Sequence, residues 1–148
     1  MRYFSIHLPR ALLFLVLILS LFACAKTPNE RLLRETLDAM QAAGEKRDVG
    51  AFMDFVSDDF SGQNASMDRR ALTAFMLGIR MRTENIGVTR TKTSITMQGE
   101  RAKVEFALIV TDGGKILPAQ GQFVAAQTQW RFSGGAWQLV SANWSDAF

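Results

Sequence analysis

The chain of 148 residues has few of the side chains that most enzymes use, because it contains one Cys, one His and one Tyr. These are Cys24, His7 and Tyr3, and all three lie within the first 24 residues. If that segment is a targeting signal, the remaining domain has no His, no Tyr and no free thiol. Catalysis by His, Cys nucleophiles, tyrosine oxyanion donors, zinc sites and disulfides are then excluded together.

The sequence also has no large excess of positive or negative charge. The whole chain carries 17 Lys and Arg against 14 Asp and Glu. Because Arg2 and Arg10 belong to the first segment, the remaining domain has a net charge of about +1. Such a balance gives no basic surface for nucleic acids, so we expect no nucleic-acid partner. The length is that of one domain with an ordinary hydrophobic core.

The longest apolar run predicts a secretory signal. Residues 11–23 read ALLFLVLILSLFA and follow a start that contains Arg2 and Arg10. A helix of that length spans about 20 Å, which is short of the ~30 Å hydrocarbon core of a membrane. This layout is typical of a cleaved signal peptide, and an uncleaved short anchor is the alternative.

Leu21-Phe22-Ala23-Cys24 closes this run and resembles the lipobox of bacterial lipoproteins. The resemblance implies a signal peptide over residues 1–23, followed by a lipidated N-terminus and short linker over residues 24–28. Acyl chains on Cys24 would anchor the protein to a membrane. Ala25 follows Cys24 in place of an Asp retention signal, which implies a place in the cell envelope, at the outer membrane and facing the periplasm.

The residues after the linker predict three helices. Thr27-Pro28-Asn29-Glu30 reads as a helix start with Thr27 as N-cap, and Gly44 as its end. Asp48 and Ser66 are the N-cap candidates of a short second helix and of a third helix. The apolar residues that recur at helical spacing are Leu33, Leu37 and Met40, then Phe52, Phe55 and Val56, then Leu72, Phe75, Met76 and Ile79.

After Gly87 the period of the apolar residues changes to two, which predicts strands. Residues 88–98 and 101–111 form a hairpin around Gly99-Glu100. This register sets Met97 opposite Ala102, Ile95 opposite Val104, and Thr93 opposite Phe106. We expect Val104 and Phe106 to be buried. The residues expected on the opposite face are Arg90, Lys92, Lys103 and Glu105.

A second hairpin joins residues 121–132 to residues 137–144 through Gly134-Gly135. A two-residue loop pairs Phe132 with Trp137 and Trp130 with Leu139. The same register leaves Phe123, Val140, Ala142 and Trp144 on the opposite face. This switch of sides predicts a bulge or strong curl, or else a second buried face at an oligomer contact. A homodimer through a sheet face is therefore an open alternative.

Three helices followed by a four-stranded antiparallel meander predict an α+β domain with the helices on one sheet face. The segments Arg47-Asp48-Val49, Ser57-Asp58-Asp59-Phe60 and 128–141 resemble the nuclear transport factor 2-like fold, also called SnoaL-like or cystatin-like. The resemblance covers residues 29–148 and implies a curled sheet that wraps a long helix to form a cone. This fold hosts isomerases, dehydratases, epoxide hydrolases and non-catalytic modules, so it does not determine a function.

The resemblance implies an apolar pocket inside the cone, open at one end to a small ligand. The residues expected there are Phe55, Phe60, Phe75, Met76, Phe106, Trp130 and Phe132, with Arg80 at the mouth. We expect Trp130 to report ligand entry by fluorescence.

The sequence offers no catalytic set of residues. Isomerases of this fold use a Tyr and cyclases use a His, and neither follows residue 24. Asp58 and Asp59 point about 100° apart on a helix and do not converge, so we expect no metal and no cofactor. The leading hypothesis is a non-catalytic envelope lipoprotein that binds a small apolar ligand or a protein partner. The alternatives are a carboxylate-dependent isomerase or hydratase and a structural subunit of an envelope assembly.

Overall fold

A computed structural model describes residues 28–82, 84–112, 115–116 and 123–146 of the chain. The signal peptide, Cys24 and Ala25 lie outside these residues. Within them, no helix combines the length and the apolar character that crossing a membrane requires.

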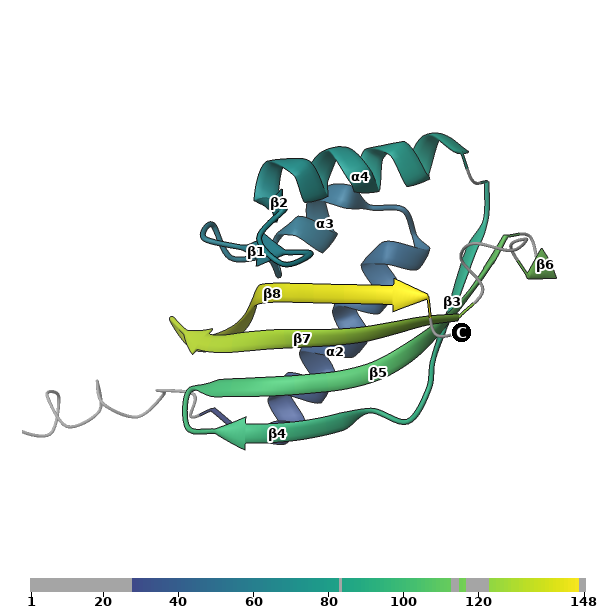
Figure 1. Cartoon of the computed structure of the whole chain (residues 1–148). Coiled ribbons are helices and arrows are strands. Elements are labelled where there is room, and N and C mark those ends of the chain that lie inside the picture. Colours follow the sequence, from purple (N-terminus) through teal and green to yellow (C-terminus); the bar gives the residue numbers. More distant parts are fainter. Residues whose placement is uncertain (1–27, 83, 113–114, 117–122, 147–148) are drawn as a thin grey trace, which may run out of the picture.

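All three described helices precede the strands of the main sheet, and one short pair of strands lies between the second and the third helix (Figure 1). The helices are α2 (Glu30–Glu45), α3 (Val49–Met53) and α4 (Arg69–Arg82). The strands are β1 (Ser61–Gly62), β2 (Met67–Asp68), β3 (Ile86–Arg90), β4 (Ser94–Gln98), β5 (Arg101–Asp112), β6 (Lys115–Ile116), β7 (Phe123–Ser133) and β8 (Ala136–Asp146). The predicted α+β order is confirmed, with the short β1–β2 pair and β6 as additions.

The helices begin at polar caps, two of which differ from the predicted ones. Asp48 caps α3 as predicted, and its side chain accepts a hydrogen bond from a backbone N–H three residues on, at 3.0 Å. Asn29 rather than Thr27 caps α2 in the same way, at 2.7 Å. Asp68 rather than Ser66 caps α4 at 2.7 Å. The Ser66 hydroxyl instead donates to the carbonyl of residue 63 at 2.7 Å, so it belongs to the preceding turn.

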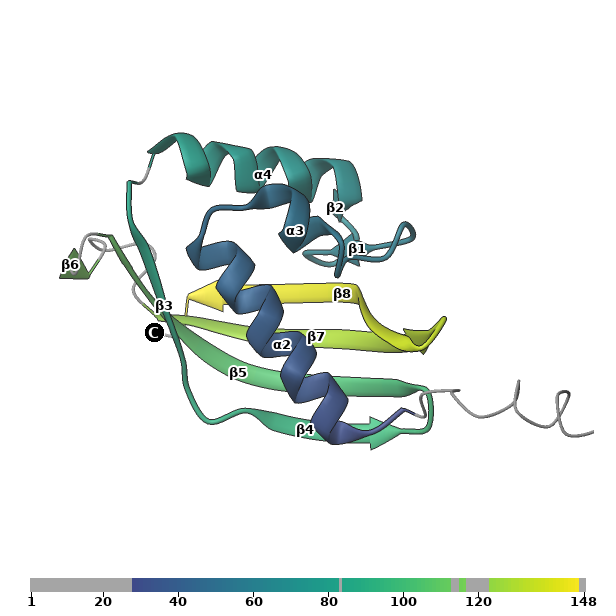
Figure 2. The ribbon, with the colours of Figure 1, turned by 180° about the vertical axis from the view of Figure 1, so that it is seen from behind.

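The main sheet is antiparallel and open, in the order β3–β5–β7–β8, with β4 continuing the line of β3 along β5. One face of it, here called the inner face, is crossed by α2, and α4 lies beyond the edge formed by β8 (Figures 1 and 2). The segment between α3 and β1 covers that edge, since the Ser57 N–H donates to the Leu139 carbonyl at 2.9 Å. The core lies between α2, α3 and the inner face.

The hairpin of β4 and β5 has the predicted register. Met97 pairs with Ala102 and Ile95 with Val104, and Gly99 takes the positive φ of 61° that its turn needs. Val104 is fully buried, as predicted. Phe106 is only half-buried, which differs from the prediction.

The strand predicted over residues 88–98 is broken, and the break corrects two predictions. Thr91 interrupts the regular backbone pairing with β5. Its N–H donates to the Ala107 carbonyl at 2.8 Å, but the Ala107 N–H donates to the Thr91 hydroxyl, at 3.0 Å, and not to a backbone carbonyl. Pairing in β3 is thereby shifted by one residue, so that Arg90 lies opposite Leu108 and Thr93 has no place opposite Phe106. A one-residue shift exchanges the faces of a strand. Arg90 therefore points to α2 and pairs with Asp38, instead of joining the outer face.

The hairpin of β7 and β8 has the predicted turn and contains the predicted bulge. Phe132 pairs with Trp137 and Trp130 with Leu139. The next pair joins residues 129 and 141, which leaves Val140 as the extra residue. The bulge places Ala142 and Trp144 on the inner face. The prediction that they lie on the opposite face is therefore wrong. The side chain of Phe123 lies outside the described part of the chain.

Candidate functional site

The inner face of the sheet has two ends that differ in burial. The end near the two glycine turns, here called the closed end, is sealed by the helices. Its residues are Ala102, Val104, Thr128, Trp130, Phe132 and Leu139, all of them buried. Trp130 is 1% exposed, and its indole N–H donates to the Thr128 hydroxyl at 2.9 Å.

The opposite end of the same face, here called the open end, is apolar but incompletely covered. Its residues are Phe106, Leu108 and Val110 of β5, Val124 and Ala126 of β7, and Trp144 of β8, all of them half-buried. Side chains alternate along a strand, and the observed pairs set these residues on the same side as the closed end. Incompletely covered apolar surface is the kind of surface that an apolar ligand would cover.

Helix α4 contributes an aromatic contact to the open end. The rings of Phe75 and Trp144 have centroids 5.9 Å apart and a tilt of 32°, a separation at which aromatic pairs attract. Phe75 is nevertheless 45% exposed, which is high for a large apolar side chain. The Phe75–Trp144 pair therefore stays accessible to a small molecule.

The predicted pocket residues are divided between the two ends and the surface. Phe60, Trp130 and Phe132 are buried in the core, and Phe55, Met76 and Phe106 pack against it while partly exposed. Phe75 and Arg80 are exposed. Of the predicted set, Phe75 and Phe106 therefore belong to accessible apolar surface.

Trp144, Leu108, Val110 and Val124 were not among the predicted site residues. Trp144 was missed because the sequence left a bulge and an oligomer contact as alternatives, and the bulge at Val140 decides its face. Trp144 is half-buried whereas Trp130 is sealed, so Trp144 is the better fluorescent reporter of an apolar ligand.

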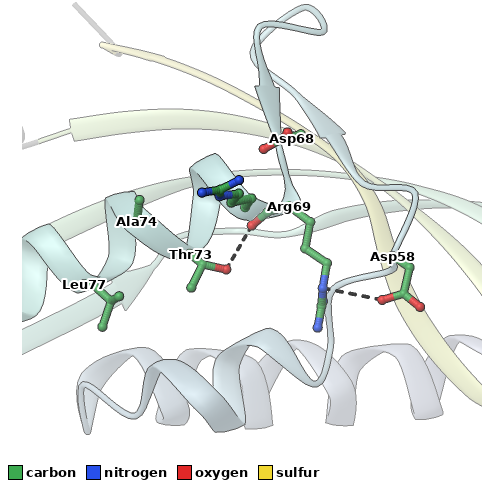
Figure 3. A pocket seen from close by; sticks show the side chains of 7 residues that line it. Asp58, Asp68, Arg69, Thr73, Ala74 and Leu77 are labelled. Atoms are coloured by element: carbon green, nitrogen blue, oxygen red, sulfur yellow. Dashed lines mark hydrogen bonds and ion pairs between the residues drawn. The ribbon is translucent and has the colours of Figure 1, made fainter.

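A hollow lies on the surface beside α4. It has a volume of about 630 Å³, and its lining residues are Asp58, Asp68, Arg69, Arg70, Thr73, Ala74 and Leu77 (Figure 3). The Arg69 guanidinium donates to the carbonyls of Val56 at 2.9 Å and Met53 at 3.3 Å, and lies 3.5 Å from an Asp58 carboxylate oxygen. Arg69 thus ties the start of α4 to the end of α3, and its charge is used within the fold.

The neighbouring acid, Asp59, takes part in a different contact. Arg131 of β7 donates to both Asp59 carboxylate oxygens, at 2.9 and 2.8 Å, and to the Ser57 hydroxyl at 2.8 Å. The Ser57 hydroxyl in turn donates to Asp59. The hydrogen bonds from Arg131 hold the pKa of Asp59 well below its usual range, so Asp59 is an anion at neutral pH and a poor general base. Asp58 and Asp59 lie in a turn after α3 and not on a helix as predicted, and their carboxylates contact different cations, Arg69 and Arg131.

Two further observations bear on chemistry. Glu105 is exposed on the outer face, and its hydrogen bond with Lys103 lowers the pKa of its carboxyl group. Among the residues that the structure describes, no three His, Cys, Asp or Glu side chains gather into a group that would hold a metal ion.

Comparison with known proteins gives the fold. No protein-family model and no curated protein sequence matches this chain. A protein of unknown function from Pseudomonas putida KT2440, described as nuclear transport factor 2-like, is 21% identical with a TM-score of 0.67 over 80% of this chain and 87% of its own. A protein of the same fold family from Streptomyces avermitilis, with dehydratase as its proposed activity, is 20% identical with a TM-score of 0.67 over 80% of this chain and 95% of its own.

Bd1075 of Bdellovibrio bacteriovorus is 12% identical with a TM-score of 0.68 over 78% of this chain. The aligned part is 40% of Bd1075, so this chain spans less than half the length of that protein. These likenesses show that the chain has the nuclear transport factor 2-like fold, with an antiparallel sheet that is not closed.

Proposed function

We propose that this chain is a lipid-anchored, non-catalytic protein of the cell envelope whose domain binds a small apolar ligand at the open end of the inner face. One observation carries this proposal: six apolar side chains stay half-exposed on the same strands whose other ends are sealed. Covering such surface stabilises a complex by about 25 cal/mol per Å². An apolar ligand would supply that cover.

The shape of the domain favours a small molecule over a protein at this site. The open end lies on the face that α2 crosses, and α4 lies along the adjacent edge (Figure 2). Both helices would hinder a rigid protein surface, whereas a small fatty-acyl or steroid-like molecule needs to contact only the incompletely covered side chains. Phe75 and Trp144 would then contact the ligand directly.

The residues of the domain favour binding over turnover. No His or Tyr follows residue 24, and the acids with perturbed pKa values, Asp59 and Glu105, are both stabilised as anions. A general base at neutral pH needs the opposite shift. The dehydratase activity proposed for the Streptomyces avermitilis protein makes a carboxylate enzyme the second candidate.

The anchor is the part of the proposal that comes from the sequence. Leu21-Phe22-Ala23-Cys24 supports lipidation of Cys24, and Ala25 supports a place at the outer membrane, facing the periplasm. The domain of residues 29–148 would then be held at the membrane by a linker of a few residues.

A fluorescence titration tests the binding site. Residues 29–148 are expected to form a soluble domain, and addition of a fatty acid or a steroid should shift its tryptophan emission. The response should vanish in Trp144→Phe and persist in the matched control Trp130→Phe, because Trp130 lies at the closed end. A response that survives Trp144→Phe would contradict the site.

A second measurement tests the absence of turnover. Isomerisation and hydration assays between about pH 5 and 9 should give no product, since the pKa values of Asp59 and Glu105 are lowered, away from those of a general base at neutral pH. Turnover that disappears when one Asp or Glu is replaced would establish the enzyme instead.

A further inference from the structure

Helix α4 is apolar on two opposite sides. Leu72 points into the core and is 5% exposed. On the far side, Leu77 is 43% exposed and Met81 87% exposed. At 3.6 residues per turn, Arg70, Ala74, Leu77 and Met81 fall on one line opposite Leu72, and this line is here called the outer stripe. The open end of the sheet accounts for Phe75 but not for the outer stripe.

We propose that the outer stripe of α4 docks an acidic amphipathic helix of a protein partner. Residues four, three and four apart form the seam that a second helix packs against. The 630 Å³ hollow lies along this seam, since Ala74 and Leu77 line both (Figure 3). A Cβ built on Gly78 meets no atom within 4 Å among the described residues, so a partner helix has room to approach beside the stripe.

The charge of α4 determines the chemistry of the partner. The helix reads RRALTAFMLGIRMR, with four Arg and no acidic residue. Arg69 is used by the fold, whereas Arg70, Arg80 and Arg82 are exposed. Carboxylates that flank an apolar stripe on the partner would meet these cations, and a second copy of α4 would bring like charges together.

The position of the anchor favours a protein over the lipid surface, and this step rests on the proposed lipidation of Cys24. α2 begins beside β4, and α4 lies beyond β8 at the opposite edge of the sheet (Figures 1 and 2). A linker of five residues reaches at most about 18 Å. The width from β4 to the outer side of α4 is roughly 25 Å, from strand spacing and helix diameter. The outer stripe would thus face away from the membrane that holds Cys24.

A matched pair of peptides tests this proposal with the full chain in a non-ionic detergent. Both peptides carry the same leucine stripe at helical spacing, one flanked by Glu and the other by Lys, and each bears a fluorophore for anisotropy. The Glu peptide should bind at least tenfold more tightly, which corresponds to about 1.4 kcal/mol. Its affinity should fall as salt is raised.

Two double variants locate the binding site, and a third variant serves as the control. Leu77→Ser with Met81→Ser, and separately Arg70→Glu with Arg80→Glu, should each weaken the Glu peptide at least tenfold. Arg101→Glu reverses an exposed charge on the outer face of the sheet and should leave the affinity unchanged. Circular dichroism establishes that each variant is folded, which is expected because all the changed side chains are exposed.

Three outcomes would overturn the proposal. If the Lys peptide binds as tightly as the Glu peptide, the partner need not be acidic and the proposal is wrong. Self-association of the full chain that Met81→Ser abolishes would assign the stripe to a second copy. Binding to phosphatidylglycerol vesicles that Arg70→Glu with Arg80→Glu abolishes would assign it to lipid. The Trp144 titration is independent of all three, so failure here leaves the apolar ligand site standing.

Discussion

Two fully buried tryptophans differ in one hydrogen bond. Trp130 and Trp137 are each 1% exposed. The Trp130 indole N–H donates to the Thr128 hydroxyl at 2.9 Å, and that hydroxyl donates to the Val104 carbonyl at 3.2 Å. Within the described part of the chain, the indole N–H of Trp137 has no acceptor. A buried polar group without a partner costs about 1–3 kcal/mol.

The pair allows a comparison at constant loss of volume. Trp130→Phe and Trp137→Phe remove the same atoms, but only the first breaks a hydrogen bond, and the second removes an unpaired donor. We expect Trp130→Phe to lower the free energy of unfolding by about 1–2 kcal/mol more than Trp137→Phe does. Chemical denaturation of both variants measures the difference, and equal losses would contradict it.

Asp59 predicts a pH dependence of stability. The hydrogen bonds from Arg131 lower the pKa of Asp59 in the folded state below the ordinary value of an aspartate. A depressed folded pKa contributes stability above the unfolded pKa, and this contribution is lost as pH falls through the folded pKa. Unfolding measured from pH 7 down to about 2 should therefore show a smaller acid loss in Asp59→Asn than in the wild type.

Asp54→Asn is the matched control, because it removes an exposed carboxylate from the same region without touching Arg131. Below about pH 4, Asp54→Asn should lose as much free energy of unfolding as the wild type does. If Asp59→Asn loses as much stability at low pH as the wild type does, the hydrogen bonds between Asp59 and Arg131 do not stabilise the fold in solution.

At the scale of elements, the break between β3 and β4 decides where two cations lie. Arg90 lies on the inner side, pairs with Asp38 of α2, and has a side chain only 16% exposed. Lys92, two residues on, is exposed. A long side chain packed along a helix contributes through its methylenes as well as its charge.

Alanine substitutions test the shifted register. Arg90→Ala should lower the free energy of unfolding by about 1–2 kcal/mol, and Lys92→Ala by less than about 0.5 kcal/mol. Thermal or urea unfolding of the two variants gives the comparison. Equally small losses in the two variants would indicate that both side chains lie on the outer face, as in a strand that is continuous over residues 88–98, and would contradict the shift at Thr91.

The features that the sequence predicted are those with local causes. Helical spacing predicted the helices that become α2, α3 and α4, and the glycine turns at Gly99 and Gly134 predicted both hairpin registers. Positive φ angles of 61° and 60° at these glycines show why the turns form there.

The features that the sequence did not predict depend on pairing between distant residues. The bulge at Val140 was one of two alternatives, and nothing local chose it, so the face of Trp144 was assigned wrongly. The shift at Thr91 arises from its two hydrogen bonds with Ala107, sixteen residues away. The division of the inner face into a closed and an open end follows from where α2 crosses the sheet.

At the scale of the whole molecule, the sequence predicts a lipid anchor. Cys24 follows an apolar run and ends a lipobox-like tetrapeptide. The wild type should therefore incorporate a labelled fatty acid in a bacterial host, and Cys24→Ser should not. Labelling that continues in Cys24→Ser would contradict the lipoprotein assignment.

The two proposals assign different partners to two surfaces of the domain. The open end of the inner face offers half-buried apolar side chains to a small ligand, and the outer stripe of α4 offers exposed apolar side chains between cations. Phe75 and Leu77 lie on opposite sides of the same helix. Occupation of one surface therefore leaves the other accessible.

Methyl-resolved NMR of residues 29–148 tests the central claim most directly, with the fatty acid or steroid that shifts the Trp144 emission as the probe. The probe should shift the methyl signals of Leu108, Val110 and Val124 and leave those of Val104 and Leu139 in place. Shifts confined to the closed end or to Leu77, or none at a saturating probe concentration, would contradict it.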